Sequence, residues 1–403
     1  MRNDIPSKYM ALKVVGPLGD YLAARIQRLD MPSTIPSTTI EELGNTQHAG
    51  TITDTPEVNA TFQAMDVSIK LFAALTGTDA DSYPAAGVDI SNLNEVDLIG
   101  VVRSDTTSDY VKSIHLRKCQ ITGFTFTYSV DGEATEEYTA GGSEKRWFRY
   151  DVVVDTFEAA ATSPVSLSET ALQLKNDDYV LSVILDGAYL SKGSGSPAAG
   201  EYVATASDVS FADTVASKLV VVYHANPTGN NWSDVSDSTI PAAIRGRSQP
   251  VYIGLNNVLR VQSVTIRGTF PSTPIREMGN TNLVGVTIQN PQVTGDLAVL
   301  DTDLSLVSLL AQGSLTDTDN EYLVSEFTYS GLSLLVRIYD PSTTSETRTD
   351  SDVLKTVFVP EIKVTSEGHT TNVGGSASQT FGWESVDGRC LVFSGYPSGE
   401  YLV

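Results

Sequence analysis

Apolar and polar residues alternate along much of this chain, which is typical of half-buried β-strands. The alternation is clearest from Cys119 to Val130 and from Gly50 to Ala64. Asp131-Gly132 follows the first of these and predicts a tight hairpin turn. Further strands are predicted at residues 10–15, 21–29, 98–103, 111–116, 133–140 and 147–154.

Helical spacing appears in two short stretches. Apolar residues follow Asp66 at positions 69, 72 and 73 and stop before Gly77, which predicts one amphipathic helix capped by Asp66. A second such stretch runs from Asp301 to Gly313. We expect both helices to serve core packing.

The chain repeats itself at an offset of 235 residues. The stretch Pro36-Ser37-Thr38-Thr39-Ile40-Glu41-Glu42-Leu43-Gly44-Asn45-Thr46 returns as Pro271-Ser272-Thr273-Pro274-Ile275-Arg276-Glu277-Met278-Gly279-Asn280-Thr281. Between residues 25 and 76, seventeen of fifty-two positions are identical at this offset. This similarity indicates a duplicated unit.

The repeat divides the chain into three parts. Residues 1–155 and 241–403 form the two copies, whereas residues 156–240 have no counterpart. The middle part has strand candidates at 179–185, 201–207 and 218–223, separated by Gly- and Ser-rich turns. We expect a small Ig-like β domain there, projecting from the exterior and removable without loss of the remaining fold.

Two long segments, Met31–Ala49 and roughly Ile266–Val284, lack any hydrophobic period. We predict a loop of about nineteen residues in each copy, since nothing in either segment indicates a strand or helix. Loops of this length in compact domains are commonly functional or interaction elements.

The chain is strongly acidic, with 26 basic and 49 acidic residues and a formal net charge of -23. Such a surface does not hold DNA through its phosphates, because that requires Lys and Arg. It could let DNA pass without binding, or it could serve solubility in a salty habitat. No apolar run approaches 18 residues, so no membrane-spanning segment is predicted.

Candidate chemistry is sparse. The four histidines are not spaced as metal ligands, and no catalytic or phosphate-binding motif occurs. We therefore expect no catalytic residues, no metal site and no cofactor, and a protein that is not an enzyme. Cys119 and Cys390 are too few for a disulfide framework and are expected to be buried or idle thiols.

The order of elements resembles the tail tube proteins of long-tailed bacterial and archaeal viruses. Each half has a strand, a long loop carrying Glu-Leu/Met-Gly-Asn-Thr, a strand, a short helix and a long hairpin. The stretch from Ile121 to Glu136 is similar to that family's hairpin, as is Glu42-Leu43-Gly44-Asn45 followed by Pro56-Glu57-Val58. The resemblance covers both copies and leaves 156–240 unexplained. A usual member carries one tube domain and builds six-fold rings, whereas this chain carries two.

The resemblance implies a mainly β protein with two tail-tube-type β-sandwich or barrel domains, each with a short helix. It implies a virion tail protein, made in the host cytoplasm, whose trimers form pseudo-six-fold rings. Its partners would be further copies of itself, the tape measure, tail terminator and distal tail proteins, and genomic DNA passing through the lumen without specific binding.

The resemblance also assigns contacts. The ring-stacking candidates lie in the two long loops: Pro36, Thr38, Glu42, Gly44, Asn45, Thr46, Pro271, Thr273, Glu277, Gly279, Asn280 and Thr281. The hairpin contact candidates are Asp131, Gly132, Gly374 and Gly375. The competing class is an extracellular β-sandwich protein, such as an adhesin or a surface or carbohydrate-binding protein, with the middle segment as its working part.

Overall fold

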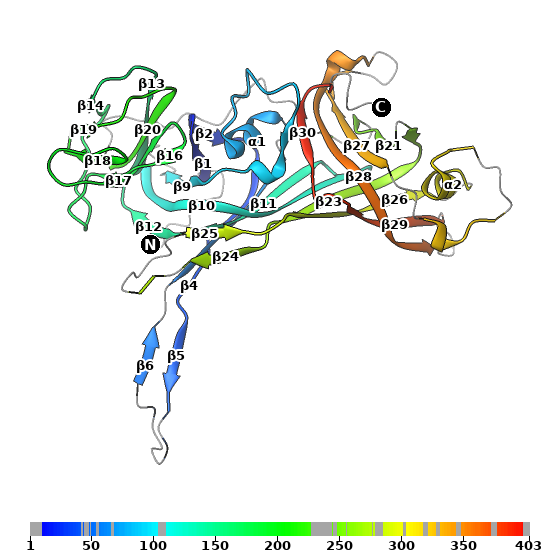
Figure 1. The fold of residues 1–403 in the computed structure, drawn as a ribbon, viewed down its shortest axis with the longest axis horizontal. Coiled ribbons are helices and arrows are strands. Elements are labelled where there is room, and N and C mark those ends of the chain that lie inside the picture. The colour runs from blue at the N-terminus through cyan, green and yellow to red at the C-terminus, as the bar shows by residue number, and fades with distance from the viewer. Residues whose placement is uncertain are drawn as a thin grey trace.

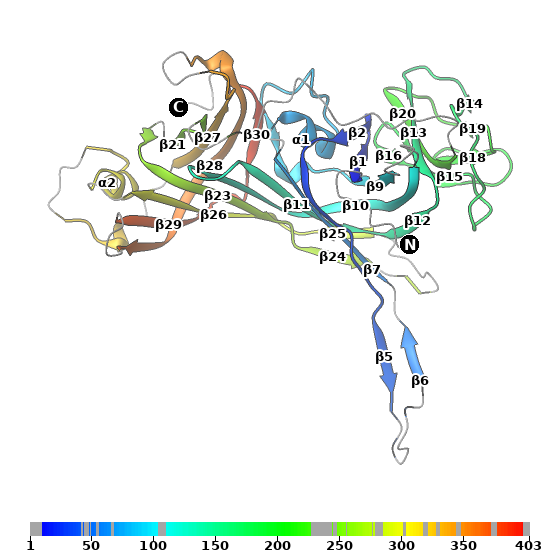
Figure 2. The ribbon, with the colours of Figure 1, turned by 180° about the vertical axis from the view of Figure 1, so that it is seen from behind.

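The computed structural model describes residues 10–397, except for 42, 44–47, 49, 54–55, 66–67, 104–109, 227–243, 245–247, 255, 276, 279–284, 301–303, 317–320, 328–330, 344–347 and 372–376. As predicted, the fold is mainly β, with large antiparallel sheets and, in the described part, two short α-helices. Neither of these helices has the length and apolar content that crossing a bilayer requires. Figures 1 and 2 show an elongated body with one hairpin projecting from it.

The strands and the α-helix in the described part of the first half are β1 (Met10–Gly16), β2 (Gly19–Ala23), β3 (Ile26–Asp30), β4 (Ser33–Thr34), β5 (Ser37–Ile40), β6 (Gly50–Thr53), β7 (Glu57–Ala64), α1 (Ile69–Thr76), β8 (Val88–Asp89), β9 (Val96–Arg103), β10 (Tyr110–Ser129), β11 (Thr135–Gly142) and β12 (Glu144–Phe148). Its strands pair in the order β2-β1-β9-β10-β11-β7-β3, and β12 also pairs with β10.

The second half contains β21 (Val251–Ile253), β22 (Asn256–Val258), β23 (Val261–Thr269), β24 (Ser272–Ile275), β25 (Gly285–Ile288), β26 (Gln292–Leu300), α2 (Ser305–Gln312), β27 (Leu332–Tyr339), β28 (Val353–Thr370), β29 (Ser378–Ser385) and β30 (Leu391–Ser394). Its strands pair in the order β22-β21-β27-β28-β29-β26-β23, and β30 also pairs with β28. The pairing order is therefore the same in both halves.

Local geometry also repeats at the offset found in the sequence. Arg25 and Arg260 both have positive φ, at 54° and 62°. The carbonyl oxygen of each accepts one hydrogen bond from the side chain of the glutamine two residues later and one from the backbone N–H at position 65 or 300. The strand after each arginine begins with a bulge in the same register. Each arginine thus ends one strand and redirects the chain into the next, so the single predicted strand 21–29 is divided into β2 and β3.

The inserted segment forms two four-stranded sheets, β13-β20-β15-β16 and β14-β19-β18-β17. Its strands are β13 (Asp151–Glu158), β14 (Val165–Ser166), β15 (Val180–Leu185), β16 (Ala188–Tyr189), β17 (Ser191–Lys192), β18 (Glu201–Ala204), β19 (Asp208–Phe211) and β20 (Lys218–Ala225). The three strands predicted here are β15, β18 and β20. The strand predicted at 147–154 is wrong, because β12 ends at Phe148 and β13 pairs with β20 in the inserted sheet.

The inserted segment packs on the first half through an apolar cluster. Val15, Ile99 and Val101 face Ile184 and Val220, and all five side chains are buried. Removal of this segment would uncover an apolar sheet face, which argues against the expectation that it can be removed without loss; that expectation stays a prediction. Its place on the exterior of an assembly stays a prediction.

One hydrophobic core runs through both halves. It joins Phe62, Phe126 and Tyr138 of the first half to Val357 and Phe381 of the second. The two halves therefore pack as one body, which Figure 1 shows as a continuous curved layer of strands.

The two segments predicted as loops form two-stranded hairpins, so that prediction is wrong for their described parts. In the first, β5 pairs with β6, and Thr38 faces Ile52. In the second, β24 pairs with β25, and Thr273 faces Thr287, which is the same register at the same offset. We call these two hairpins the arms. Sequence reasoning missed β5, because both its faces are exposed and no alternation marks it. β6 falls at the start of the strand predicted from Gly50 to Ala64.

The helix caps differ from the prediction at one end. Gly77 and Gly313 end the helices in the left-handed conformation, as predicted. The first helix begins at Ile69, and the side chain of Ser68 accepts a hydrogen bond from the N–H of Lys70, so Asp66 is not its cap. The second helix follows Leu304, which gives no side-chain cap. Asp66 and Asp301 themselves lie outside the described residues.

Candidate assembly surfaces

The two halves are joined by an antiparallel strand pair. The C-terminal part of β10 pairs with β23, from Gly123 opposite Thr269 to Ser129 opposite Ser263. The ladder continues at both ends, where Val130 N donates to Gln262 O and Phe270 N donates to Thr122 O, both at 2.9 Å. We call this β10–β23 pairing the internal joint; it makes one sheet out of the sheets of the two halves (Figure 1).

A second strip of contacts lies away from the internal joint. β8 of the first half pairs with β30 of the second, with Val88 opposite Val392. Arg389 Nε donates to Asp89 Oδ2 at 2.9 Å. The hydroxyl of Tyr83 donates to the carbonyl oxygen of Val392 at 3.0 Å, and burial raises the pKa of Tyr83 well above its ordinary value. These contacts join the two halves at a second place, separate from the internal joint.

A buried ion pair lies between the halves. Lys355 Nζ is 2.5 Å from Glu136 Oε1, and both side chains are fully buried. The Tyr138 hydroxyl donates to the other Glu136 oxygen at 2.9 Å, and the Lys355 ammonium lies over the rings of Phe72 and Phe126. Such a pair is costly to break because the remaining charge stays buried. The pair therefore ties β28 of the second half to β11 of the first.

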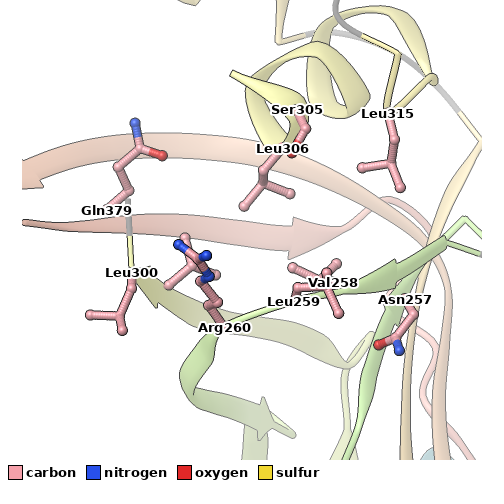
Figure 3. Close-up of a pocket in the computed structure, with 10 residues that line it drawn as sticks. Asn257, Val258, Leu259, Arg260, Leu300, Ser305, Leu306, Leu315 and Gln379 are labelled. Carbon is pink, nitrogen blue, oxygen red and sulfur yellow. The ribbon is translucent and has the colours of Figure 1, made fainter. Parts of the chain in front are cut away.

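The far end of the second half presents apolar surface. Leu304 beside α2 and Leu259 after β22 are exposed, whereas their counterparts in the first half, Ile69 and Ala24, are buried. A cavity of about 180 Å³ opens next to them. Its lining comes from β22, β26, α2 and β29, and Figure 3 shows Leu306 of α2 on one side, Arg260 on the other and Gln379 of β29 at one end. Exposed apolar side chains around a hollow are typical of a contact surface.

The arms carry apolar side chains that the body does not cover. Leu43 and Met278, at equivalent positions, are fully exposed, and the equivalent pair Ile40 and Ile275 is also exposed. Figures 1 and 2 show the β5–β6 arm projecting away from the body, whereas the β24–β25 arm runs alongside it. An isolated two-stranded hairpin is marginally stable in water, so a projecting arm favours a partner.

The predicted contact residues fall in three groups. Pro36, Thr38, Pro271, Thr273 and Glu277 lie on the arms, and Pro36 and Pro271 are half-buried while the other three are exposed. The second group, Asp131 and Gly132, lies in the connection between β10 and β11, beside the internal joint. The predicted tight turn is wrong, because the last paired residues of this hairpin are Thr127 and Thr135. The third group lies outside the described residues: Glu42, Gly44, Asn45, Thr46, Gly279, Asn280, Thr281, Gly374 and Gly375.

Sequence reasoning missed the most exposed apolar residues of the arms. The signal was present in the repeat itself, because positions 40 and 275 are both Ile and positions 43 and 278 are Leu and Met. Apolar side chains kept in both copies of a polar segment indicate buried or contacting positions. In the described chain these side chains are exposed.

A polar cluster connects the inserted segment to the first half. Asp97, fully buried, lies 2.9 Å from both His115 Nε2 and the hydroxyl of Tyr189, and it accepts a hydrogen bond from the N–H of Lys118. Burial acts to raise the pKa of Asp97, but the charge and hydrogen bond of the adjacent His115, together with the hydrogen bond from the N–H of Lys118, outweigh it and hold that pKa below its ordinary value. Tyr189 comes from the inserted segment, so this cluster sets how that segment docks.

The chain matches no family model, and a search of curated proteins found no similar sequence.

Proposed function

We propose that this chain is the structural protein of a viral tail tube, assembling as rings of three chains that stack into a hollow tube and conduct DNA. The observation that carries the proposal is the internal joint. Two copies of one unit, with the same strand order, join edge to edge through β10 and β23. Two copies per chain and three chains per ring give six units around the axis.

The internal joint supports a ring because it is heterologous. It joins β10 of the first unit to β23 of the second, and β23 is the counterpart of β3. The two units therefore contact each other through different edges. Contacts of this kind repeat around a ring when the rotation closes, and they continue as a filament when it does not. The exposed apolar residues Leu259 and Leu304 support a further contact at the far end of the second half.

The arms support the stacking of rings. The β5–β6 arm projects away from the body, the β24–β25 arm runs alongside it, and the two arms expose equivalent apolar side chains. A second ring would cover these side chains. The net charge of -23 supports a lumen through which DNA slides, because phosphates find few cations to bind.

Negative-stain electron microscopy of the purified protein tests this proposal. The expected images show rings at low concentration and tubes at high concentration. The competing extracellular adhesin or carbohydrate-binding protein predicts separate particles at every concentration. Separate particles throughout would overturn the tail tube proposal.

A further inference from the structure

Each strand of the internal joint has a counterpart in the other copy. β10 corresponds to β28, and a shared bulge fixes the alignment: Ile121 and Gly123 face Ala140 and Thr139, while Val364 and Ser366 face Trp383 and Gly382. All four positions correspond at an offset of 243. β23 corresponds to β3 and β4 at the offset of 235.

The two counterpart strands have an open edge. In the described part of the chain, Ser366–Thr370 of β28 pairs only with β29, and β3 and β4 pair only with β7. The exposure of the side chains also differs between the internal joint and the open edge. Phe124 and Phe126 are buried in the internal joint, whereas positions 366 and 368–370 are exposed. A long open edge of this kind is a template for another strand.

We propose that the open edge of β28 in one chain pairs antiparallel with β3 and β4 of a second copy of this chain. The register follows from the internal joint, where Gly123 faces Thr269 and Thr127 faces Thr265. Transferred through the two offsets, Ser366 faces Thr34 and Thr370 faces Asp30. This inter-chain joint rests on the proposed ring, of which it is the contact between chains.

The internal joint also shows which residues direct their backbone N–H groups toward the opposite strand. Thr122 with Phe270 and Val130 with Gln262 are hydrogen-bonded pairs, so the even-numbered residues of β10 point their N–H groups at β23. Their counterparts in β28 include Glu367 and His369. The pairs Ser366 with Thr34 and Thr370 with Asp30 are therefore non-hydrogen-bonded, and in such pairs the side chains of opposite residues lie closest.

The geometry permits a cross-linking test with internally matched controls. Ser366→Cys combined with Thr34→Cys, and Thr370→Cys combined with Asp30→Cys, place thiols opposite each other between chains. The exchanged combinations are Ser366→Cys with Asp30→Cys and Thr370→Cys with Thr34→Cys. They use the same four substitutions, but their two thiols lie four residues out of register, which is about 13 Å along the strands. A disulfide cannot span that distance.

Two further features of the chain help the test. Cys119 and Cys390 are free and buried, and burial raises the pKa of both thiols, so they contribute little background. Thr127→Cys with Thr265→Cys, the equivalent pair of the internal joint, should form a disulfide within one chain and confirm that such pairs oxidise.

On a non-reducing gel of oxidised rings, we expect two-chain and three-chain species from both in-register combinations and at least ten times less from the exchanged ones. Glu367→Pro removes an N–H that faces only the open edge, so it should leave a folded chain that forms neither rings nor cross-links. Glu367→Ala keeps that N–H and should behave as the unmodified protein.

The outcomes separate this inference from the proposed function. Rings that form, but cross-link equally in all four combinations or only in the exchanged ones, would overturn the inter-chain joint and leave the tail tube proposal standing. Rings formed by the Glu367→Pro variant would also overturn it. If no rings form and no combination cross-links under any condition, both the joint and the tail tube proposal fail.

Discussion

Lys355 and Glu136, 219 positions apart in the chain, form a fully buried ion pair between its two halves. In the second copy the position of Glu136 is taken by Gln379, on the matching strand β29. The pair is therefore a feature of the contact between the halves and not of the repeated unit itself.

The first prediction concerns this ion pair. Lys355→Met should lower the free energy of unfolding by about 3–5 kcal/mol, because Glu136 is left charged and buried without its partner. The double variant with Glu136→Gln should recover most of that loss, since no uncompensated charge remains. Denaturant titration of the single and double variants measures the coupling. Additive losses would show that the two residues do not depend on each other.

The second prediction concerns the arms. Leu43→Ser combined with Met278→Ser should leave the free energy of unfolding unchanged, because both side chains are fully exposed in the chain. Rings should still form, but tubes should not, and electron microscopy distinguishes the two. Val386→Ser removes another exposed apolar side chain outside the arms and serves as the control. Tubes of normal length from the double variant would show that the arms do not stack rings.

The third prediction concerns Asp97. Its pKa is lowered in the folded chain, so its charged form adds stability that is present above the unfolded pKa of about 4 and is lost as the pH falls through the folded value. Asp97→Asn should therefore cost about 1–3 kcal/mol at pH 7 and progressively less below pH 4. Denaturant titration from pH 7 to pH 3 measures this difference. If the cost of Asp97→Asn does not change with pH, Asp97 is not charged in the folded chain.

The fourth prediction concerns the inserted segment. Joining Asp155 to Ile240 through a short Gly-Ser linker should give an aggregating chain, because Val15, Ile99 and Val101 lose their cover. Replacing these three residues with Thr in the shortened chain should restore solubility. The soluble fraction and the binding of a hydrophobic dye measure both effects. A shortened chain that is soluble without the Thr substitutions would show that the apolar cluster is not needed.

Strands with one buried face could be predicted from the sequence, and β7 and β11 show why. In both, buried residues alternate with more exposed ones along the strand, which is the pattern that predicts a strand. β9 was also found, although Val96 to Val102 is buried on both faces, because a short apolar run between turns also indicates a strand. The docking of the inserted segment on β9 could not be inferred from that run.

The arms and the joints could not be predicted in the same way. β5 exposes both faces, so its Ser, Thr and Ile residues read as a loop, whereas β6 falls within the strand predicted from Gly50 to Ala64. The internal joint pairs β10 with β23 through the backbone, and no side-chain pattern specifies which edge meets which. The repeat carried the remaining information, since it predicted that both halves contain the same elements.

The central claim is that three chains form one ring of six units, and the mass of a solubilised ring tests it most directly. Native mass spectrometry of rings released from tubes should give three times the chain mass of 43.1 kDa. Six chains per ring would contradict the pseudo-six-fold arrangement, and a stable monomer at high concentration would contradict assembly itself.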